Sequence, residues 1–408
     1  MEVIQTDVCV VGGGPAGLTL ALLLARSGVD VVLAERMRSF DREYRGEILQ
    51  PSAQLALAEI GVLDAVLARG AYPMRSFQLA TPDKVLLDID YRRLPAPHNH
   101  LLSVPQRHVL ESLHEACAAT PGFRQLDGSS ANQVLSQDGR VVGIRCGTGE
   151  SEREVRARWV VAADGRYSKT RQLAGIDYRR VDTFQHDIAW LKLKVPGFRS
   201  EVVQIHRNGE HVSLIHDSYP DQVQVGLLVP HGRYRELSQQ GIDHVKSLLC
   251  KAVPQFAGEI TDQVHKLGDL TLLDVFSGRA SEWVRDGLVL IGDCAHTHSP
   301  IGAQGVNLAI ADAVELHPAL VEALRADTSS AGALAEFAQR RQRAVESVFS
   351  LQARQSRAML SDGKVINALR PVLAKVLPHT PIFGKVLRTI AYGAVPTRPR
   401  TDLFAPVA

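Results

Sequence analysis

The stretch from Asp7 to Gly17, DVCVVGGGPAG, decides the fold of this chain. A short β-branched run, residues 7–11, stops at a glycine-rich turn, after which leucines continue at helical density. A second apolar run, residues 29–33, ends at Glu35. Strand, turn, helix and strand in this order predict a βαβ unit with two parallel strands. Because both strands are apolar throughout, we expect them to be covered on both faces.

The glycine turn has the spacing Gly12-x-Gly14-x-x-Gly17. The first glycine permits a tight turn, the second lets backbone N–H groups approach a pyrophosphate, and the third allows close packing of helix on strand. Glu35 stands where a carboxylate would accept both hydroxyls of a ribose, and it would repel a 2′-phosphate. These features predict a site for FAD or NAD rather than NADP. The alternative is a tight turn that holds no ligand.

Two later segments decide between these cofactors. Residues 164–171, DGRYSKTR, follow one buried strand, and residues 292–307, which begin with Gly-Asp, follow another. An aspartate at a strand end, followed by small residues and a helix start, can bind ribityl hydroxyls while the helix N-terminus faces an electron-rich ring. Either segment alone is more typical of a plain turn or cap. Their occurrence together, in this order, favours FAD.

The rest of the chain contains further elements that can be recognised by periodicity. Residues 183–230 alternate between apolar and polar positions, which predicts an antiparallel sheet with one exposed face. Residues 134–146 indicate a hairpin, and residues 107–118 a helix with one apolar face. A long helix is expected from about Gly305. His317-Pro318 should kink that helix or start a new one, because proline cannot donate a backbone hydrogen bond.

With these segments in place, the sequence resembles the class A flavoprotein monooxygenases, the family typified by p-hydroxybenzoate hydroxylase. The matching segments, with Asp312 beyond the last of them, extend from residue 7 to about residue 325. The resemblance implies an α/β fold, with a Rossmann-like FAD-binding domain of the p-hydroxybenzoate hydroxylase type, an inserted antiparallel-sheet substrate domain and a helical C-terminus. We expect the FAD-binding domain at 1–174 and 281–330, the substrate domain at 175–280 with part of 70–105, and the C-terminal helices at 331–408.

The resemblance also implies which residues contact FAD. The glycines of the turn would contact the pyrophosphate, and Glu35 the adenosine ribose. Arg45 and Arg107 match two arginines that contact FAD, although their residue type alone indicates surface arginines. Asp164 matches an aspartate associated with both FAD and NAD(P)H, and Asp293 would hold the ribityl chain. The full expected set is Gly12, Gly14, Ala16, Gly17, Glu35, Arg36, Arg45, Arg107, Asp164, Asp293, Pro300, Gly302, Gln304, Gly305, Val306 and Asn307.

In this family NAD(P)H reduces the flavin, O2 adds to it, and the flavin hydroperoxide delivers one oxygen atom to the substrate. The resemblance therefore implies an FAD-dependent monooxygenase of secondary metabolism that hydroxylates or epoxidises an aromatic, quinone-like or polyketide-like small molecule. Two alternatives are a flavin-dependent reductase of the geranylgeranyl reductase type and a non-catalytic flavin-binding protein. A flavin-dependent halogenase is disfavoured because its WxWxIP signature is missing, since the three tryptophans stand apart.

The sequence does not identify a catalytic residue, and we expect no metal site. A phenolic substrate would need a base, and His206, His211 and His216 fall in the sheet region. Their five-residue spacing places successive histidines on opposite faces of a strand, so ordinary solvation or hydrogen bonding is the better interpretation. His296 and His298, beside the expected flavin segment, are expected to make structural hydrogen bonds.

The composition limits the remaining functional classes. The 408 residues are 45% apolar and 22% charged, with a net charge of +2, which predicts two or three globular domains and no nucleic-acid binding. The five cysteines are widely spaced and no signal peptide or membrane span is recognisable, so we expect a cytoplasmic protein.

The C-terminal region is unusually basic. Residues 340–400 hold twelve Lys or Arg and two acidic residues, with apolar stripes at 365–377 and 382–390. A docked helix with a solvated basic face is the favoured interpretation, and peripheral contact with the inner face of a membrane is the alternative. The oligomeric state is not indicated.

Overall fold

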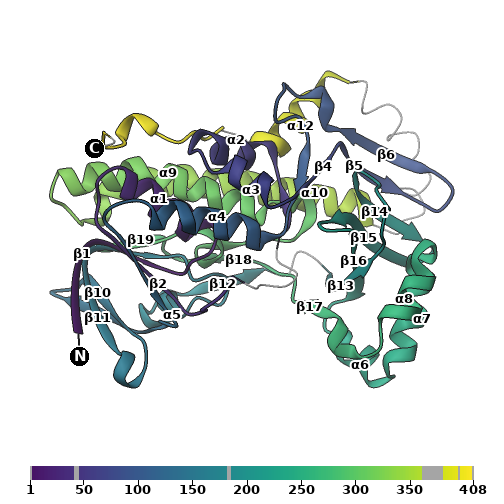
Figure 1. The fold of residues 1–408 in the computed structure, drawn as a ribbon, viewed down its shortest axis with the longest axis horizontal. Helices are drawn as coiled ribbons and strands as arrows, with labels where there is room; N and C mark the ends of the chain where they lie inside the picture. Colours follow the sequence, from purple (N-terminus) through teal and green to yellow (C-terminus); the bar gives the residue numbers. More distant parts are fainter. Residues whose placement is uncertain (1, 41–45, 182–184, 361–379, 394–395, 407–408) are drawn as a thin grey trace.

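The structure is a computed structural model that describes residues 2–40, 46–181, 185–360, 380–393 and 396–406. Two bodies lie side by side along the long axis of the molecule (Figure 1). Two long helices, α9 (Gly305–Arg325) and α10 (Ala335–Leu360), run along this axis. Among the described residues, no helix is both long and apolar enough to cross a bilayer.

The first body is built on an eight-stranded sheet whose central strands are parallel. In spatial order these are β20 (Leu288–Leu290), β11 (Arg153–Ala162), β1 (Glu2–Val11), β2 (Val31–Glu35) and β8 (Phe123–Asp127). The parallel pairing of β1 with β2 confirms the predicted βαβ unit. Antiparallel strands complete the sheet, namely β19 (Val284–Arg285) and the predicted hairpin of β9 (Ala131–Gln137) and β10 (Arg140–Cys146).

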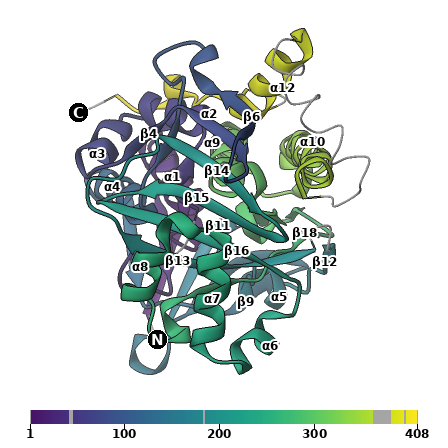
Figure 2. The same cartoon turned by 90° about the vertical axis from the view of Figure 1, so that its right-hand side faces the viewer.

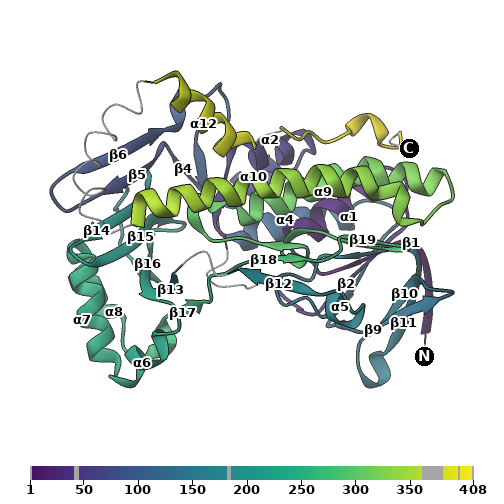
Figure 3. The same cartoon turned by 180° about the vertical axis from the view of Figure 1, so that it is seen from behind.

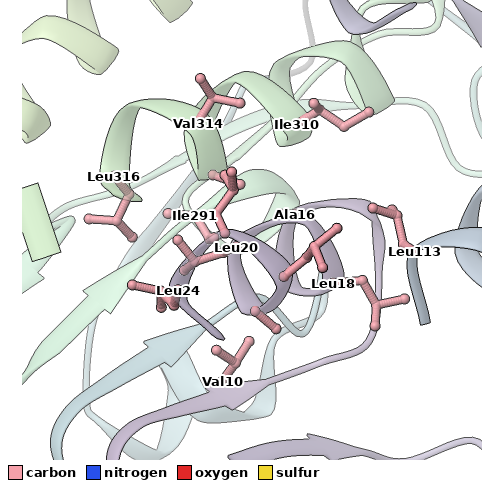
Figure 4. Close-up of a cluster of buried hydrophobic side chains, with 14 of the residues drawn as sticks. Val10, Ala16, Leu18, Leu20, Leu24, Leu113, Ile291, Ile310, Val314 and Leu316 are labelled. Atoms are coloured by element: carbon pink, nitrogen blue, oxygen red, sulfur yellow. The ribbon is translucent and has the colours of Figure 1, made fainter. Parts of the chain in front are cut away.

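Helices cover one face of this sheet with apolar side chains. Helix α1 (Pro15–Arg26) lies between α9 and α4 (Gln106–Ala118). Helices α4 and α9 confirm the helices predicted at residues 107–118 and from about Gly305. Leu20 and Leu24 of α1 belong to one buried apolar cluster with Val314 of α9 (Figure 4). Both leucines are fully buried. The shared core fixes the helix that follows the glycine turn against the helix that begins at Gly305.

The expectation that a new helix could start at Pro318 is wrong. Helix α9 runs without interruption from Gly305 to Arg325 and contains Pro318. A proline inside a helix removes one backbone hydrogen bond, and its ring crowds the preceding turn. Here Leu316 and Leu320, on either side, are fully buried, so apolar packing offsets the loss of one hydrogen bond and keeps the helix continuous.

The second body is a seven-stranded sheet covered by two helices, α7 (Ile242–Ala252) and α8 (Ala257–Gln263) (Figure 2). In spatial order its strands are β17 (Thr271–Leu273), β13 (His186–Lys194), β16 (Gln222–Pro230), β15 (His211–Ser218), β14 (Val202–Asn208), β5 (Ser76–Ala80) and β6 (Val85–Asp90). All neighbouring strands are antiparallel except β14 and β5, which are parallel.

The prediction that one face of this second sheet is exposed is wrong. Residues 187–191 of β13 and 223–227 of β16 are all buried, so both faces are covered. One face packs against α7 and α8, and the other contributes Trp190 to a cluster with Ile301 of the first body. The alternating residues of these strands therefore face two buried surfaces, one against α7 and α8 and one against the first body, and neither face is exposed to solvent.

Two small sheets join the bodies. One contains β12 (Tyr178–Val181), β18 (Ser277–Ala280) and β21 (His296–Thr297), and the other contains β3 (Ile48–Leu49), β7 (Leu101–Ser103) and β4 (Tyr72–Met74). We propose the division into domains at 1–174 with 281–330, 175–280 with part of 70–105, and 331–408. The short helices are α2 (Pro51–Glu59), α3 (Leu63–Ala68), α5 (Lys169–Leu173) and α6 (Tyr234–Gln239).

The C-terminal helices pack on both bodies. Helix α10 runs along the back of the molecule, and α12 (Pro381–Tyr392) lies beside β4 and β5 (Figure 3). The apolar side chains Phe383, Leu387 and Ile390 of α12 are buried in one cluster with residues of β4, β6 and β14. This burial confirms the expectation of a docked helix for α12. The apolar stripe at 365–377 lies outside the described residues.

Candidate active site

The three glycine-containing motifs of the sequence meet in space. A Cβ atom built on Gly12 would lie 2.6 Å from the backbone oxygen of Ala163, directly before Asp164. A Cβ atom on Gly292 would lie 3.3 Å from the Cβ of Ala16, at the start of α1. The turn at 12–17 therefore touches both the segment 164–171 and the segment 292–307. This convergence gathers three strand ends at one edge of the first sheet.

The glycine turn is shaped as the sequence predicts. Gly12 has a φ of 107°, and a Cβ on Gly17 would lie 1.9 Å from the backbone oxygen of Gly12, so neither position can carry a side chain without movement of the backbone. Helix α1 begins after Gly14 without a side-chain cap and has no acidic residue in its first turn. Its N-terminal N–H groups therefore remain suited to a phosphate, which agrees with the cradle that FAD requires.

Glu35 lies at the end of β2, directly beside this turn. Its Oε2 accepts a hydrogen bond from Gly13 N at 2.5 Å, and its Oε1 accepts one from Met37 N at 2.8 Å. The side chain is buried. These backbone donors fix the orientation of the carboxylate at the place where a ribose that follows the pyrophosphate would lie. Arg36, the next residue, is exposed.

Asp164 is used locally as a helix cap. Its Oδ2 accepts hydrogen bonds from Thr170 N and Thr170 Oγ1, each at 2.9 Å, and its Oδ1 accepts one from Ser168 Oγ. The segment is tied to the second motif because Arg171 Nη1 donates to the backbone oxygen of Cys294 at 2.8 Å. Asp293 forms an ion pair with Arg166, with 3.5 Å between Oδ2 and Nη2. The two motifs therefore hold each other in place.

The segment 300–307 forms a tight turn that leads into α9. Gly302 has a φ of 73°, and Gln304 precedes the helix without a side-chain cap. The side chain of Asn307 bonds to the backbone on both of its atoms: Oδ1 accepts from Gln50 N at 2.8 Å, and Nδ2 donates to Ile48 O at 3.2 Å. Asn307 thereby holds β3 against the start of α9. Pro300, Gly305 and Val306 lie in the same turn.

Of the two arginines that the resemblance implies as FAD contacts, Arg45 and Arg107, only Arg107 is described in the structure. Arg45 lies outside the described residues. Arg107 lies in the first turn of α4, is half exposed and pairs with Glu111, with 3.6 Å between Nε and Oε1. Gly46, the next residue after Arg45, lies close to Val306, because a Cβ built on it would lie 3.7 Å from a methyl group of Val306. The segment after Arg45 therefore touches the first turn of α9.

A buried ionic network lies beneath the Gly-Asp motif. Asp312 accepts hydrogen bonds from His296 Nε2 at 2.6 Å, from Gly292 N at 2.7 Å and from Arg341 Nε at 2.7 Å. His296 Nδ1 also lies 2.7 Å from His298 Nε2. These contacts confirm the expectation of structural hydrogen bonds at both histidines. Arg341 was not predicted from sequence, because it comes from α10 and belongs to no recognisable motif.

Hydrogen bonds and ionic neighbours explain the electrostatics of this network. Burial raises the pKa of Asp312, but His296, Arg341 and the hydrogen bonds outweigh it and hold this pKa well below its usual range. Burial and the neighbouring His296 lower the pKa of His298 well below its usual range. Asp312 is therefore the fixed negative charge of the network, and His298 is neutral.

An apolar pocket lies between the two bodies and α12. Residues from β3, β5, β6 and β14 line it, together with residues 301–303 and Ile390 of α12. Its polar groups are few: Tyr91 Oη donates to Gln50 Oε1 at 3.1 Å, and Gln50 Nε2 donates to the backbone oxygen of Gly302 at 2.9 Å. Tyr91 and Gln50 were not predicted from sequence, because only the folded chain brings them to the segment 300–307. A mostly apolar lining with few polar groups is common at small-molecule sites.

One cluster of potential metal ligands occurs among the described residues, at Asp187, His231 and Asp274. Asp187 accepts hydrogen bonds from His231 Nδ1 at 2.8 Å and from two backbone N–H groups. Asp274 is neutralised by Arg180, which donates to both of its carboxylate oxygens. Protein donors therefore already serve these carboxylates, and we assign no metal to the cluster.

Comparisons with known proteins agree with this geometry. A family model described as "FAD binding domain" matches residues 5–351. The 6-methylpretetramide 4-monooxygenase of Streptomyces rimosus is 50% identical over 400 residues, which cover 98% of this chain and 95% of that enzyme. Protoasukamycin 4-monooxygenase of Streptomyces nodosus subsp. asukaensis is 28% identical over 333 residues, 79% of this chain and 81% of that enzyme.

The solved structures support the fold independently. The p-nitrophenol 4-monooxygenase of Pseudomonas putida DLL-E4 superposes with a TM-score of 0.81 at 20% identity, over 97% of this chain and all of that chain. The expected α/β architecture, FAD as cofactor and NAD(P)H as co-substrate are confirmed. The reductase and the non-catalytic protein find no support, because these relatives are oxygen-inserting enzymes. The chain belongs to the FAD binding domain family and is an FAD-dependent monooxygenase acting on an aromatic or polyketide-like small molecule.

Proposed function

We propose that this enzyme hydroxylates 6-methylpretetramide, or an aromatic polyketide of the same class, at position 4. The observation that carries the proposal is the 50% identity to the 6-methylpretetramide 4-monooxygenase, which extends over 98% of this chain and therefore includes both bodies and the pocket between them. The apolar lining of the pocket, with Tyr91 and Gln50 as its polar groups, supports an aromatic substrate.

The chain supplies binding, orientation and exclusion of water. We propose that the turn 12–17 and the N-terminus of α1 bind the pyrophosphate of FAD, that Glu35 binds the ribose, and that Asp293 and the turn 300–307 hold the ribityl chain and the ring. Bound FAD would supply the redox chemistry, namely uptake of a hydride from NAD(P)H and transfer of one oxygen atom from O2. With the ring bound beside the turn 300–307, the uncapped N-terminus of α9 would face it, and the helix dipole would stabilise negative charge there.

The remaining predicted contacts belong to the same proposal. Asp164 caps α5 beside the glycine turn, where its backbone lies against Gly12. Arg36 and Arg107 are proposed as outer contacts of FAD, and Arg45 as an arginine near the ring. Gln304 donates from Nε2 to the backbone oxygen of Ile390, so the turn that frames the ring also holds α12 over the pocket.

Turnover with a defined substrate tests this function. Purified holoenzyme is mixed with NADH or NADPH, O2 and 6-methylpretetramide, and the product is analysed by mass spectrometry and NMR. We expect substrate-stimulated NAD(P)H oxidation and a product heavier by one oxygen atom at position 4, with the label retained from 18O2. Oxidation of NAD(P)H that yields only hydrogen peroxide with this compound would contradict the proposed substrate.

We also propose that any membrane contact of this protein is electrostatic and peripheral. Residues 340–400 carry twelve basic and two acidic residues, which supports attraction to anionic lipid. The buried apolar face of α12 is already in contact with protein and offers no apolar surface to a bilayer. Co-sedimentation with phosphatidylglycerol vesicles should then occur at low salt and disappear at physiological salt. Absence of binding at low salt would contradict this proposal.

A further inference from the structure

A row of three polar side chains crosses the second sheet on the face that looks toward the turn 300–303. Lys192 on β13 lies opposite Gln224 on β16, and Gln224 lies opposite His216 on β15. Residues directly opposite each other in a sheet point to the same face. Trp190, two residues before Lys192 and therefore on this face, packs in one cluster with Ile301. The row thus faces the segment proposed to frame the flavin ring.

The middle of the row is a buried polar group without a protein partner. Gln224 is 3% exposed, and among the described residues no group forms a hydrogen bond with its Oε1. Buried side-chain oxygens are rarely left in this state in native proteins, and each such case calls for a ligand, an ion or a water molecule. Gln224 stands between Lys192 and His216 across the sheet, so a partner of its Oε1 would lie beside this row.

His216 is held in one tautomer. Its Nδ1 lies 2.9 Å from the backbone oxygen of Asp217, and a carbonyl oxygen can only accept a hydrogen bond. Nδ1 therefore carries the proton, and Nε2 of the neutral ring carries a lone pair. The ring has a second hydrogen-bonding contact, with Ser103 Oγ at 3.4 Å, and this contact is also on Nδ1. Within the described part of the chain, Nε2 therefore has no hydrogen-bond partner.

Burial favours the neutral form of the His216 ring, and the charged groups around it act in both directions. Burial lowers the pKa of His216, and the ammonium of Lys192 lowers it further. The carboxylates of Glu47 and Asp217 act in the opposite direction but do not outweigh burial. An imidazole in this state is able to accept a proton through Nε2.

Lys192 is anchored from the side of the first body. Its Nζ lies 2.5 Å from Oε1 of Glu47, and Oε2 of the same carboxylate accepts a hydrogen bond from Ser218 Oγ at 2.9 Å. Glu47 is buried and directly follows Gly46, which touches the first turn of α9. The ion pair therefore couples the position of the ammonium in the sheet to the turn that frames the ring.

We propose that Lys192, Gln224 and His216 bind the oxygen-bearing edge of the aromatic substrate and that His216 is the catalytic base for its phenol. This inference rests on the proposed function, which supplies a phenolic substrate. The O–H bond of the phenol breaks, the proton forms an N–H bond at Nε2, and the electron pair remains on the oxygen as a phenolate. Lys192 stabilises the phenolate, whose ring is more electron-rich and reacts more readily with an electrophilic oxygen atom.

A second histidine of the same sheet provides a matched control. His206 on β14 is buried to the same degree as His216, and burial lowers its pKa as well. It lies opposite Ser213 of β15, which is an odd number of residues from His216, so His206 points to the other face of the sheet. Substitution of His206 reports the cost of removing a buried imidazole from this sheet without removing the proposed base.

The test measures ionisation of a bound phenol as well as turnover. The probe is 2-naphthol, added to FAD-loaded enzyme, and its ionisation is followed by difference absorbance from pH 5 to pH 10. We expect bound 2-naphthol to ionise at least about one pH unit below free 2-naphthol in the wild type and in His206→Asn. The shift should be lost in His216→Asn. Hydroxylation should fall by roughly 10²–10⁴-fold in His216→Asn, the range for loss of a general base.

Gln224→Met separates a binding role from a structural one. Methionine fills a similar volume and removes the unpaired buried oxygen, so we expect a Tm equal to or above that of the wild type. Affinity for 2-naphthol should nevertheless fall by roughly tenfold, the value of one hydrogen bond between the phenolic group and the amide of Gln224.

These outcomes are distinguishable from failure of the proposed function. A wild-type enzyme that does not bind 2-naphthol at millimolar concentration, or binds it without a lowered ionisation pH, overturns the assignment. A shift that survives in His216→Asn, or unchanged affinity in Gln224→Met, also overturns it. By contrast, a wild-type enzyme that lowers the ionisation pH of 2-naphthol but leaves 6-methylpretetramide unoxidised overturns only the proposed substrate.

Discussion

Arg341 Nε lies 2.7 Å from Oδ1 of Asp312, and both side chains are almost completely buried. The other oxygen of the same carboxylate accepts hydrogen bonds from Gly292 N and His296 Nε2. One carboxylate on α9 therefore connects helix α10 to the Gly-Asp motif at the end of β20. Helix α10 therefore helps to support the proposed FAD site, although no residue of α10 was predicted to contribute to this site.

Replacement of Asp312 by Asn should destabilise the fold and weaken FAD binding. An amide has one acceptor oxygen, so it must direct an N–H group at Arg341 or at His296 and leaves a buried cation without its counter-charge. Loss of one partner of a buried ion pair costs about 3–5 kcal/mol. Urea unfolding of the apo and FAD-loaded proteins measures this loss.

A matched substitution on the same helix controls for the change of Asp312. Glu315 lies on α9 and forms a partly exposed ion pair with Arg340, with 3.3 Å between Oε2 and Nη2. Glu315→Gln should change the free energy of unfolding by no more than about 1 kcal/mol, because exposed pairs contribute little. Equal effects of the two substitutions would contradict the role assigned to the buried network.

His317 should make the protein less stable as the pH falls below neutrality. The ring is fully buried beside Ser27 Oγ, 2.8 Å from Nε2, and burial lowers its pKa from 6.5 to about 4. Below pH 6.5 the unfolded chain binds a proton that the folded chain does not, so stability falls between pH 6.5 and 4 and levels off below. The loss from pH 7.5 to pH 5 is about 2 kcal/mol.

Urea unfolding at these two pH values checks the contribution of His317. The variant His317→Gln can keep a hydrogen bond to Ser27 but cannot titrate, so the difference in unfolding free energy between pH 7.5 and pH 5 should shrink by about 2 kcal/mol. An unchanged difference would show that other groups cause the pH dependence.

The sequence predicted the parts of the site that depend on neighbours along the chain. The spacing of Gly12, Gly14 and Gly17 requires a particular turn, and Glu35 follows from the length of one βαβ unit, so both were found without knowledge of the rest of the fold. Arg341 and Lys192 were not predicted, because the role of each depends on a contact with a carboxylate remote in sequence. Arg341 contacts Asp312, and Lys192 contacts Glu47. No local pattern distinguishes such residues from ordinary surface cations.

The predictions from sequence were wrong where tertiary packing outweighs a local preference. Pro318 disfavours a helix, but apolar packing on both sides keeps α9 continuous. Alternation in β13 indicated an exposed face, whereas this face is covered by the first body and carries Trp190 and Lys192 toward it. The ring of Trp190 lies across Gly226, where a Cβ would approach it to 2.6 Å, and such a pairing depends on register across strands.

Replacement of Gly17 by Ala should weaken FAD binding. The added methyl group would lie 1.9 Å from the backbone oxygen of Gly12, so α1 must move away from the turn that we propose to hold the pyrophosphate. Overpacking of this kind costs about 1–3 kcal/mol, which corresponds to an increase in the Kd for FAD of roughly fivefold to 150-fold. Quenching of flavin fluorescence on titration of apoprotein measures the Kd.

A second glycine tests whether the effect at Gly17 is local. Gly258, in α8 of the second body, has no atom within 4 Å of a built Cβ. Gly258→Ala should leave the Kd for FAD unchanged and stabilise the fold slightly, since alanine is the better helix former. A similar loss of FAD in both variants would argue that general destabilisation, and not the shape of the turn, is responsible.

Replacement of Ile390 by Ala should uncouple NAD(P)H oxidation from hydroxylation. Ile390 closes the apolar pocket from the side of α12, and its backbone oxygen accepts the hydrogen bond from Gln304 at 3.1 Å. A smaller side chain keeps this backbone contact but opens the pocket to water and reduces contact with an aromatic substrate. We expect KM to rise and more hydrogen peroxide to form per NAD(P)H consumed, with a stability loss near the lower end of about 2–5 kcal/mol.

Arg388→Ala, on the exposed face of the same helix, should leave the ratio of product to NAD(P)H unchanged. If both variants keep the wild-type ratio, α12 is a structural support and not a wall of the active site.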